Sequence, residues 1–287
     1  MDRLVVPANL AAAVERDGRQ EWLATLRGVI AELADRWSLR IRRPFEPGGE
    51  TSWVAPARLA DGGAAVVKVT WPHPEARDEA AGLQVWAGNG VVRLLRSEHL
   101  SGCDALLIER CLPGTALSEA PEPQQDQIVA ALLRRLWLPG PFSGIQTLDE
   151  MCLMWAASAE DRLAGSQGLD PGLARAGIDL LRSLPAGADE NVLLCTDLHA
   201  GNVLAAAREP WLVIDPKPHV GDPTYDVLQH MLNCEARLLD DPLSLIGRMA
   251  ELAGLDADRL RLWLFARCVQ ESPNRPELAD VARRVAP

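Results

Sequence analysis

Three oxygen-bearing side chains, Asp197, Asn202 and Asp215, lie close together in the run NVLLCTDLHAGNVLAAAREPWLVIDP. Carboxylate and amide oxygens are ligands that the hard ion Mg²⁺ prefers, and Mg²⁺ also binds phosphate oxygens. We therefore expect Asn202 and Asp215 to hold a nucleotide-bound magnesium ion. Asp197 would lie beside an acceptor hydroxyl, orient it and accept its proton as a phosphoryl group is transferred.

Short apolar runs are expected to position these residues. Residues 192–194, 203–205 and 211–214 are apolar and are separated by polar loops, which predicts three short strands in one small sheet. The loops that carry the three side chains would then meet at one edge of that sheet. From Pro121 onward the rest of the sequence is mainly helical, with breaks at 138–144 and 187–190 and later helices in 222–232, from Pro242 and from Asp256.

The first part of the chain predicts a leading helix followed by strands. Apolar residues recur at helical spacing from Trp22 to Trp37. Two β-rich stretches follow, 41–59 with a Gly48-Gly49 turn and 64–71 with Lys68, and they predict a hairpin and a third strand. A helix is expected over 73–86, two more strands from Val91 and from Asp104, and a linker at 112–114.

The composition narrows the class of protein. Its 287 residues are 48% hydrophobic and 24% charged, as in ordinary globular proteins. Because there is no bilayer-length apolar run and no signal-peptide pattern, we expect a cytoplasmic protein without a membrane partner. Six cysteines without a CxxC pair indicate neither a zinc site nor a disulfide framework. A net charge of −11 argues against nucleic-acid binding and suits a cationic ligand.

The run CTDLHAGNVLAAAREPWLVIDPKPHVGDPTYDV resembles the catalytic and metal-binding loops of aminoglycoside phosphotransferases. It is most similar to the branch that contains streptomycin 6-phosphotransferases and hydroxyurea phosphotransferases. In that family the loop usually reads H-x-D-L-x-x-x-N, and here Cys195 stands in the place of the histidine. Asp215-Pro216-Lys217 replaces the Asp-Phe-Gly of protein kinases, as is usual for the family.

This resemblance implies a bilobal, protein-kinase-like α+β fold. It implies an N-terminal lobe with a small antiparallel sheet (residues 1–110), a hinge or linker (111–118) and a mostly helical catalytic and substrate-binding lobe (119–287). The implied cofactors are ATP and Mg²⁺. The implied activity is transfer of the γ-phosphoryl group of ATP to a hydroxyl of a small molecule.

The resemblance also assigns residues outside the loop. Lys68 matches the lysine that contacts the α- and β-phosphates, and Glu79 matches its helix partner, with Glu75 as the competing choice. The Gly48-Gly49 turn occupies the place of a phosphate-covering loop, although a plain hairpin connection is an equal alternative. Main-chain groups near Glu109 and Cys111 would bond the adenine edge.

The element GDPTYDV carries two further carboxylates, Asp222 and Asp226. We expect both to brace the catalytic loop through hydrogen bonds and not to act in the chemistry directly. Asp222 could equally be a helix N-cap, because Pro223 follows it.

The acceptor is expected to be a cationic aminoglycoside such as streptomycin. Candidate substrate-binding residues are Asp149, Glu150, Glu235, Trp263 and Glu271. A kinase for hydroxyurea, or for another small hydroxyl or amino-alcohol metabolite, is the enzymatic alternative. A non-catalytic nucleotide binder is a further alternative, because Cys195 replaces the usual histidine.

A metallohydrolase that uses Asp197, His199 and Asp215 as ligands is a more distant alternative. It leaves Lys68 and Asn202 without a role, and the other histidines have no metal-ligand spacing. For His199 we expect a local role, in which its side chain satisfies the backbone of its own loop.

Overall fold

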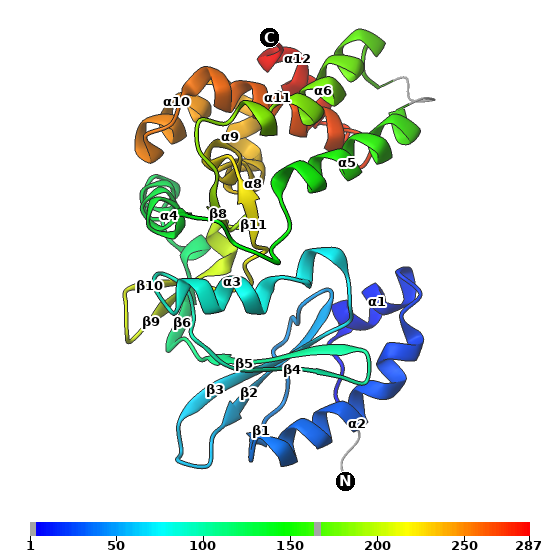
Figure 1. Ribbon diagram of the computed structural model, residues 1–287, viewed down its shortest axis with the longest axis vertical. Helices are drawn as coiled ribbons and strands as arrows, with labels where there is room; N and C mark the ends of the chain where they lie inside the picture. The colour runs from blue at the N-terminus through cyan, green and yellow to red at the C-terminus, as the bar shows by residue number, and fades with distance from the viewer. Residues whose placement is uncertain (1–3, 164–167) are drawn as a thin grey trace. The chain divides into compact units, whose positions relative to one another are not determined.

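The computed structural model describes residues 4–163 and 168–287. The chain divides into two compact units. One comprises Met1–Gly114 with Ala206–Arg208, and the other comprises Thr115–Ala205 with Glu209–Pro287. Each unit has its own secondary structure and its own core, and together they make an α+β protein (Figure 1).

The N-terminal unit is built on a five-stranded antiparallel sheet of order β1-β2-β3-β5-β4 (Figure 1). Its strands are β1 (Arg40–Ile41), β2 (Ser52–Arg58), β3 (Ala64–Thr70), β4 (Leu94–Leu100) and β5 (Cys103–Glu109). Lys68 lies on the central strand, opposite Val54 of β2 and Leu106 of β5. The small antiparallel sheet is confirmed, but Gly48 and Gly49 lie in a longer loop between β1 and β2 and not in a tight hairpin turn.

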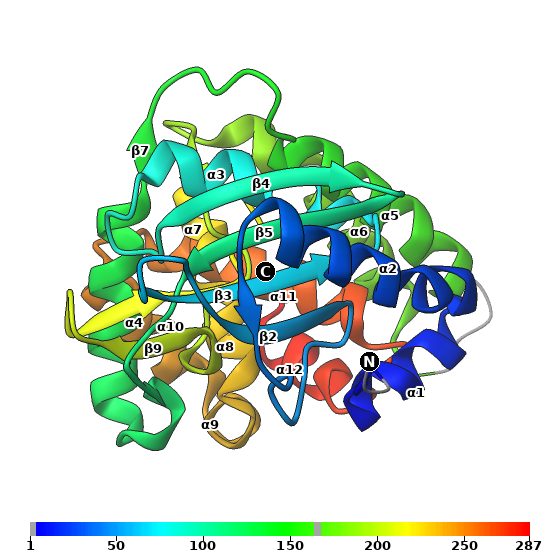
Figure 2. The ribbon, with the colours of Figure 1, turned by 90° about the horizontal axis from the view of Figure 1, so that it is seen from below.

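The two faces of this sheet carry different helices. Helices α1 (Ala8–Arg16) and α2 (Gln20–Arg36) cover one face, and their apolar residues form a core with Ala65, Val67 and Val69 of β3 (Figure 2). Because side chains alternate along a strand, Lys68 points to the other face. That face carries the 3₁₀ turn η1 (Pro74–Ala76) and helix α3 (Glu79–Trp86). The helix expected from Trp22 is therefore confirmed as α2, whereas α1 was not anticipated.

The edge strand β4 begins later than the sequence indicated. We expected a strand from Val91, but pairing with β5 starts at Leu94 and continues to Leu100. Val91 and Val92 are fully buried and precede the strand. The strand itself is mostly exposed and polar, so an apolar run does not mark it.

The C-terminal unit is mostly helical. Its helices are α4 (Glu122–Leu136), α5 (Leu148–Leu163), α6 (Pro171–Ser183), α7 (Pro223–Asp226), α8 (Leu228–Asn233), α9 (Glu235–Asp240), α10 (Pro242–Ala253), α11 (Ala257–Glu271) and α12 (Leu278–Val285), with 3₁₀ turns η2 (Leu117–Glu119), η3 (Pro185–Gly187) and η4 (Ala200–Asn202). Helix α11 is buried along most of its length and packs on α6 so closely that a Cβ at Gly177 would lie 2.6 Å from Val269. None of the described helices is long and apolar enough to cross a bilayer.

Two small antiparallel sheets accompany these helices. One has the order β10-β9-β6, with β10 (Trp211–Val213), β9 (Val203–Ala206) and β6 (Pro113–Ala116). The other has the order β11-β8-β7, with β11 (His219–Gly221), β8 (Val192–Leu194) and β7 (Leu138–Pro139). The three expected strands exist, but the expectation that they share one sheet is wrong. Each of β6, β7 and β11 has only two to four residues, too few to give a period in the sequence.

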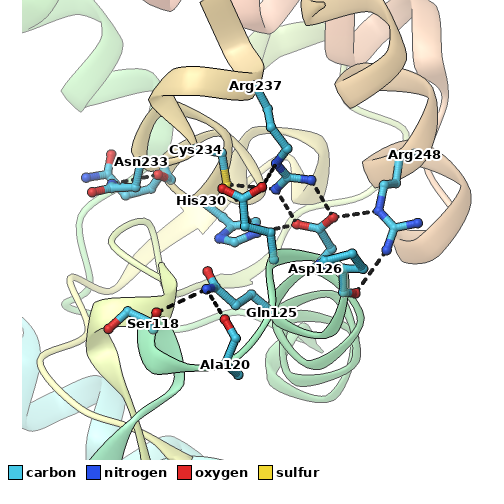
Figure 3. A network of polar contacts seen from close by, with 12 residues as sticks. Ser118, Ala120, Gln125, Asp126, His230, Asn233, Cys234, Arg237 and Arg248 are labelled. Carbon is cyan, nitrogen blue, oxygen red and sulfur yellow. Dashed lines mark hydrogen bonds and ion pairs between the residues drawn. The ribbon is translucent and has the colours of Figure 1, made fainter.

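A buried carboxylate joins four helices of this unit (Figure 3). Asp126 of α4 accepts two hydrogen bonds of 2.8 Å from Arg237 of α9, one of 2.5 Å from Arg248 of α10 and one of 2.9 Å from His230 of α8. Asp126 is completely buried. All four lone-pair directions of the carboxylate are thus used, so this one residue ties α4 to the late helices.

The same cluster contains a metal-ligand combination, because Cys234 lies beside Asp126 and His230. Its sulfur lies 3.0 Å from a guanidinium nitrogen of Arg237. Two guanidinium groups on the carboxylate already supply positive charge, so a bound cation is disfavoured there. We read the cluster as a structural junction.

The charges in the junction set the protonation states. Burial would lower the pKa of His230, but its hydrogen bonds to Asp126 and Cys234 outweigh burial and raise the pKa to about 9. Burial would raise the pKa of Asp126, but the two arginines and His230 hold it well below its usual range. At neutral pH the junction therefore contains a buried carboxylate and three cationic groups.

Replacement of Asp126 by alanine is expected to destabilise the protein strongly. Three cationic groups would lose their shared acceptor, which costs about 3–5 kcal/mol for a buried ion pair. Urea unfolding measures the loss. Glu122→Ala is the matched control, because Glu122 pairs with Arg237 from a half-exposed position and is worth at most about 1 kcal/mol. Equal losses in the two variants would contradict the junction.

The junction also predicts how stability changes with pH. The folded pKa of His230, about 9, lies above the ordinary value of 6.5, so its stabilising contribution is complete below pH 6.5 and is lost as the pH rises through 9. Unfolding free energies of the parent and of His230→Gln, measured from pH 6 to pH 10, should therefore converge at high pH. A constant difference across this range would contradict the assignment.

Candidate functional site

Asp197, Asn202 and Asp215 are brought together within the C-terminal unit. The β9–β10 register pairs Val203 with Val213, and the carbonyl of Asn202 accepts a hydrogen bond of 2.9 Å from the N–H of Ile214. Asp215 is the residue that follows Ile214 in the chain. The Asn202 side-chain amide donates to the backbone oxygen of Asp197 at 3.0 Å and lies 3.4 Å from its carboxylate. Asn202 thus lies beside both acidic residues.

The donor set of Asn202 and Asp215 fits a magnesium ion. The NH₂ group of Asn202 points to Asp197, which leaves its Oδ1 for a metal. The side chain of Asp215 is 39% exposed. One amide oxygen and one accessible carboxylate are hard ligands, and Mg²⁺ commonly completes its shell with phosphate and water oxygens.

A buried carboxylate, Asp226 at the end of α7, anchors the loop before Asp197. It accepts hydrogen bonds from the N–H groups of Cys195 at 3.0 Å and Thr196 at 2.6 Å, and from the indole of Trp137 at 2.9 Å. Burial raises the pKa of Asp226 to about 6, although these three donors act in the opposite direction. The expected bracing role is confirmed for Asp226.

Asp222 serves as the N-cap of α7, and its side chain accepts from the N–H of Thr224 at 2.8 Å. It also accepts from Arg259 at 2.7 Å and from the indole of Trp263 at 2.6 Å. The N-cap alternative for Asp222 is therefore confirmed. Its other two partners, Arg259 and Trp263, belong to α11, so Asp222 connects the start of α7 to that buried helix.

The turn at Thr196 has a strained backbone. Its φ of 48° lies in the left-handed region, which a β-branched residue rarely adopts. Such a conformation costs about 1–3 kcal/mol and requires outside support. The support comes from Asp226 and from the Thr196 hydroxyl, which donates to the carbonyl of Lys217 at 2.5 Å. Asp215 also has a positive φ, of 52°.

Cys195 contributes its backbone to the turn. Its carbonyl accepts from the N–H of Asp197 at 2.7 Å and from the N–H of Lys217 at 2.9 Å. The thiol is fully buried, and burial raises its pKa well above the ordinary value. The imidazole Nδ1 of His219 lies 3.3 Å from the Thr196 hydroxyl and 3.0 Å from the carbonyl of Lys217. Sequence reasoning missed the contacts of Thr196 and His219, because Thr196 stands at a variable position of the loop pattern and His219 lies outside it.

His199 has the local role that was expected. Its Nδ1 accepts a hydrogen bond of 3.1 Å from the N–H of Gly201, and burial lowers its pKa. A Cβ at position 201 would lie 2.8 Å from the imidazole of His199, so a larger residue there would displace the ring from this hydrogen bond. Among the described residues, the one cluster with metal-ligand spacing of His, Cys and acidic groups is at Asp126, which gives the metallohydrolase alternative no support.

The N-terminal unit contains the expected lysine–glutamate pair. Lys68 Nζ lies 2.6 Å from Glu79 Oε2, and both side chains are buried. Glu79 begins α3, so the pair links the central strand to that helix. The side chain of Glu75, the competing choice, lies outside the described residues.

The glycine turn is held by the N-terminal segment. The side chain of Asn9 accepts from the N–H of Gly48 at 2.9 Å and donates to its carbonyl at 2.6 Å. A Cβ at Gly48 would lie 2.7 Å from Pro7, and one at Gly49 would lie 3.0 Å from the carbonyl of Ser52. Local packing therefore accounts for the glycine at 48, and its N–H already has an acceptor.

The side chain of Glu109 is used within the N-terminal unit. It accepts from Arg208 at 2.9 Å and from the N–H of Arg93 at 3.1 Å, while Arg208 also donates to the carbonyls of Gly88 and Val91. Burial opposes the charge of Glu109, but Arg208 and the Arg93 N–H hold its pKa below the usual value. Cys111 is buried, which raises its pKa to about 11. Arg208 gave no signal in the sequence.

Several of the expected acceptor-binding carboxylates have partners inside the protein. Glu150 and Thr147 form a reciprocal capping box at the start of α5, with bonds of 2.9 and 3.2 Å. Glu271 pairs with Arg267 at 3.1 Å, and Glu235 lies 3.8 Å from Arg275. Asp149 is exposed in the first turn of α5.

Trp263 was expected to face an acceptor, but the structure buries it completely in α11. Its ring packs edge-to-face with Tyr225, with 5.2 Å between the ring centroids, and its indole N–H donates a hydrogen bond to Asp222. Arg267, one turn further along α11, stacks over Trp155 at 4.1 Å. The aromatic ring of Trp263 thus belongs to the core that supports the loop.

Exchange of the carboxylate of Asp226 for an amide should loosen the turn. In Asp226→Asn the added NH₂ group would face N–H groups, so a buried donor is left unsatisfied at a cost of about 1–3 kcal/mol. Hydrogen exchange at the amides of Cys195 and Thr196 should accelerate. Trp137→Phe removes a single donor and serves as the milder control; unchanged exchange in Asp226→Asn would contradict the anchor.

Known proteins share both the sequence and the fold. A hydroxyurea phosphotransferase from Kitasatospora aureofaciens is 36% identical, over 96% of this chain and 82% of that protein. A streptomycin 6-kinase from Streptomyces griseus is 34% identical, over 94% of this chain and 91% of that protein.

The fold is that of kinase-like phosphotransferases. A choline kinase from Streptococcus pneumoniae has a TM-score of 0.62 at 11% identity, over 91% of this chain and 97% of that one. The bilobal kinase-like α+β class is therefore confirmed. Residues 36–275 match the model of the family described as "Aminoglycoside/hydroxyurea antibiotic resistance kinase". The chain belongs to the aminoglycoside/hydroxyurea antibiotic resistance kinase family.

Proposed function

We propose that this protein transfers the γ-phosphoryl group of ATP to a hydroxyl group of a small molecule, an aminoglycoside such as streptomycin. The proposal depends mainly on the position of Asn202. Its side-chain amide donates a hydrogen bond to the backbone oxygen of Asp197, and its carbonyl accepts one from the N–H of Ile214, the residue before Asp215. This arrangement offers one acidic group for a hydroxyl and a separate pair of oxygen ligands for magnesium. Relatives named streptomycin 6-kinase at 33–34% identity support the acceptor class.

Asp197 is the proposed catalytic residue. The acceptor oxygen forms a bond to the γ-phosphorus, the bond from that phosphorus to the β–γ bridging oxygen breaks, and the hydroxyl proton passes to the carboxylate of Asp197. Asn202 and Asp215 would hold the magnesium ion, which neutralises phosphate charge when it is bound. The anchored turn keeps Asp197 in place, so little reorganisation is needed.

We propose that the N-terminal unit supplies the nucleotide contacts. Lys68, held by Glu79 at 2.6 Å, is the proposed ligand of the α- and β-phosphates. Main-chain groups around Glu109 and Cys111 are the proposed adenine contacts, and Gly49 remains a candidate for close approach to phosphate. In this proposal residues 1–110 form the nucleotide lobe, 111–118 the hinge and 119–287 the catalytic and acceptor lobe.

The acceptor is proposed to be cationic, in keeping with the net charge of −11. Asp149 and the half-exposed Glu235 are the carboxylates best available for it, because Glu150 caps a helix and Glu271 pairs with a buried arginine. Recognition by charge would weaken with salt. Acceptor affinity that does not change between 50 and 500 mM salt would contradict this part of the proposal.

Hydroxyurea is the second candidate acceptor, because a hydroxyurea phosphotransferase shares 36% identity with this chain.

We also propose that the protein acts in the cytoplasm. This is supported by six free cysteines, all buried, as is common in reducing compartments.

Two substitutions separate the proposed roles. Asp197→Ala should reduce phosphoryl transfer by about 10²–10⁴-fold, the usual range for a general base, while Mg-ADP affinity changes little. Asp215→Ala should lose transfer and also the magnesium dependence of nucleotide binding. Isothermal titration and initial rates measure both, and full activity in Asp197→Ala would remove the proposed base.

The deciding experiment is ADP release from Mg-ATP with a panel of streptomycin, other aminoglycosides, hydroxyurea and amino alcohols, with the product identified by mass. A phosphorylated aminoglycoside would support the main proposal, and phosphorylated hydroxyurea would support the second candidate. Bound ATP without transfer to any acceptor would favour the non-catalytic binder.

A further inference from the structure

A lysine, Lys217, contacts the proposed metal ligand Asp215. Lys217 Nζ is 2.5 Å from Asp215 Oδ1. The side chain of Lys217 is 12% exposed, whereas the side chain of Asp215 is 39% exposed. The lysine side chain is therefore the more enclosed partner of the pair, unlike the usual surface ion pair with a mobile lysine.

The backbone of Lys217 is fixed by the loop that carries Asp197. Its N–H donates to the carbonyl of Cys195 at 2.9 Å, and its carbonyl accepts from the Thr196 hydroxyl at 2.5 Å. Thr196 is in turn anchored to the buried carboxylate of Asp226. The α-carbon of Lys217 cannot drift away from Asp215, so the ammonium stays within reach of it.

The amino-acid usage of the chain sets this lysine apart. Of its 29 basic residues 27 are arginine, and the two lysines are Lys68 and Lys217. Both lysines contact a carboxylate that our proposal assigns to nucleotide or metal binding. An ammonium is a compact point charge on a flexible stem, whereas a guanidinium is a broad planar fork. Lysine at 217 therefore fits a place where one small charge must share a carboxylate.

We propose that Lys217 is a further charged residue of the phosphoryl-transfer site, which holds the Asp215 carboxylate when no metal is bound and competes with the metal for it. This inference rests on the proposed function. Asp215 has a left-handed backbone conformation, and the ammonium that contacts its Oδ1 restrains the side chain. The same ammonium adds positive charge beside the position proposed for a nucleotide-bound ion.

Competition for Asp215 can be measured without turnover. Removal of a competing cation should strengthen metal binding, so nucleotide-free Lys217→Met is expected to bind Mn²⁺ about 3–10-fold more tightly than the parent by electron paramagnetic resonance. Asp215→Ala should bind Mn²⁺ more weakly than either. A purely structural lysine would lower thermal stability and leave Mn²⁺ affinity unchanged or reduced, and this outcome would overturn the proposal.

The presence of only two lysines permits a direct observation of the pair. Protein labelled with ¹³C at the lysine ε-carbon should give two lysine signals, and Lys217→Arg identifies which of them belongs to position 217. Addition of Mg²⁺ without nucleotide should shift the Lys217 signal and leave the Lys68 signal unchanged as an internal reference. An unmoved Lys217 signal at saturating Mg²⁺ would contradict competition for Asp215.

Kinetics complete the test. Lys217→Met should lower kcat by about 100-fold, the size seen when one charge-stabilising donor is lost, with KM for ATP within about threefold. Lys217→Arg should recover only part of kcat, since a planar guanidinium replaces the compact ammonium. Arg96→Met, an exposed change on β4, is the control with full activity. A kcat within twofold of the parent in Lys217→Met would overturn the catalytic part.

The outcomes distinguish this inference from the proposed function. If the parent transfers phosphate to none of the panel, the Mn²⁺ and ¹³C measurements still decide whether Lys217 competes at Asp215. If Asp215→Ala binds Mn²⁺ as well as the parent does, there is no metal site at Asp215 and both proposals fail. If transfer occurs and the Lys217 signals do not respond, the inference alone fails.

Discussion

The carboxylate of Asp226 is the constraint on which the loop that carries Asp197 depends. It holds two consecutive backbone N–H groups, those of Cys195 and Thr196, together with the indole N–H of Trp137. These bonds stabilise a left-handed threonine that would otherwise be unfavourable. Because the turn is fixed, the next residue, Asp197, leaves it in a defined direction. The position of the proposed base is therefore determined by a residue 29 positions further along the chain.

Arginine side chains neutralise several carboxylates that have structural roles. Asp126, Asp222 and Glu109 are carboxylates that accept from arginine, and each connects elements that are distant in sequence. A buried carboxylate without such donors would cost several kcal/mol (order of magnitude). The planar guanidinium can serve a carboxylate and a carbonyl at once, as Arg208 does for Glu109 and Gly88. Structural carboxylates are in this way separated from Asp197 and from the more exposed Asp215.

The sequence predicted the elements that have a clear period or a family pattern. Helix α2, the strands β2, β3 and β5, and the relation of Lys68 to Glu79 could be anticipated, because apolar spacing and loop order are local properties. The start of the polar edge strand β4 and the existence of the short strands β7 and β11 could not be anticipated, since they are defined by pairing with distant residues. The partners of Thr196, His219 and Arg208 depend on tertiary contacts and leave no mark in the local sequence.

The cysteine at position 195 shows what the loop requires there. Its thiol is fully buried, and burial raises its pKa so far that it stays neutral. The loop uses the backbone of Cys195, with its N–H on Asp226 and its carbonyl shared by the N–H groups of Asp197 and Lys217. A side chain at this position has to fill space in the core, and none of the described bonds that orient Asp197 passes through the sulfur. Replacement of the histidine of related loops by cysteine is thus compatible with an intact turn, which removes the main reason to regard the site as inactive.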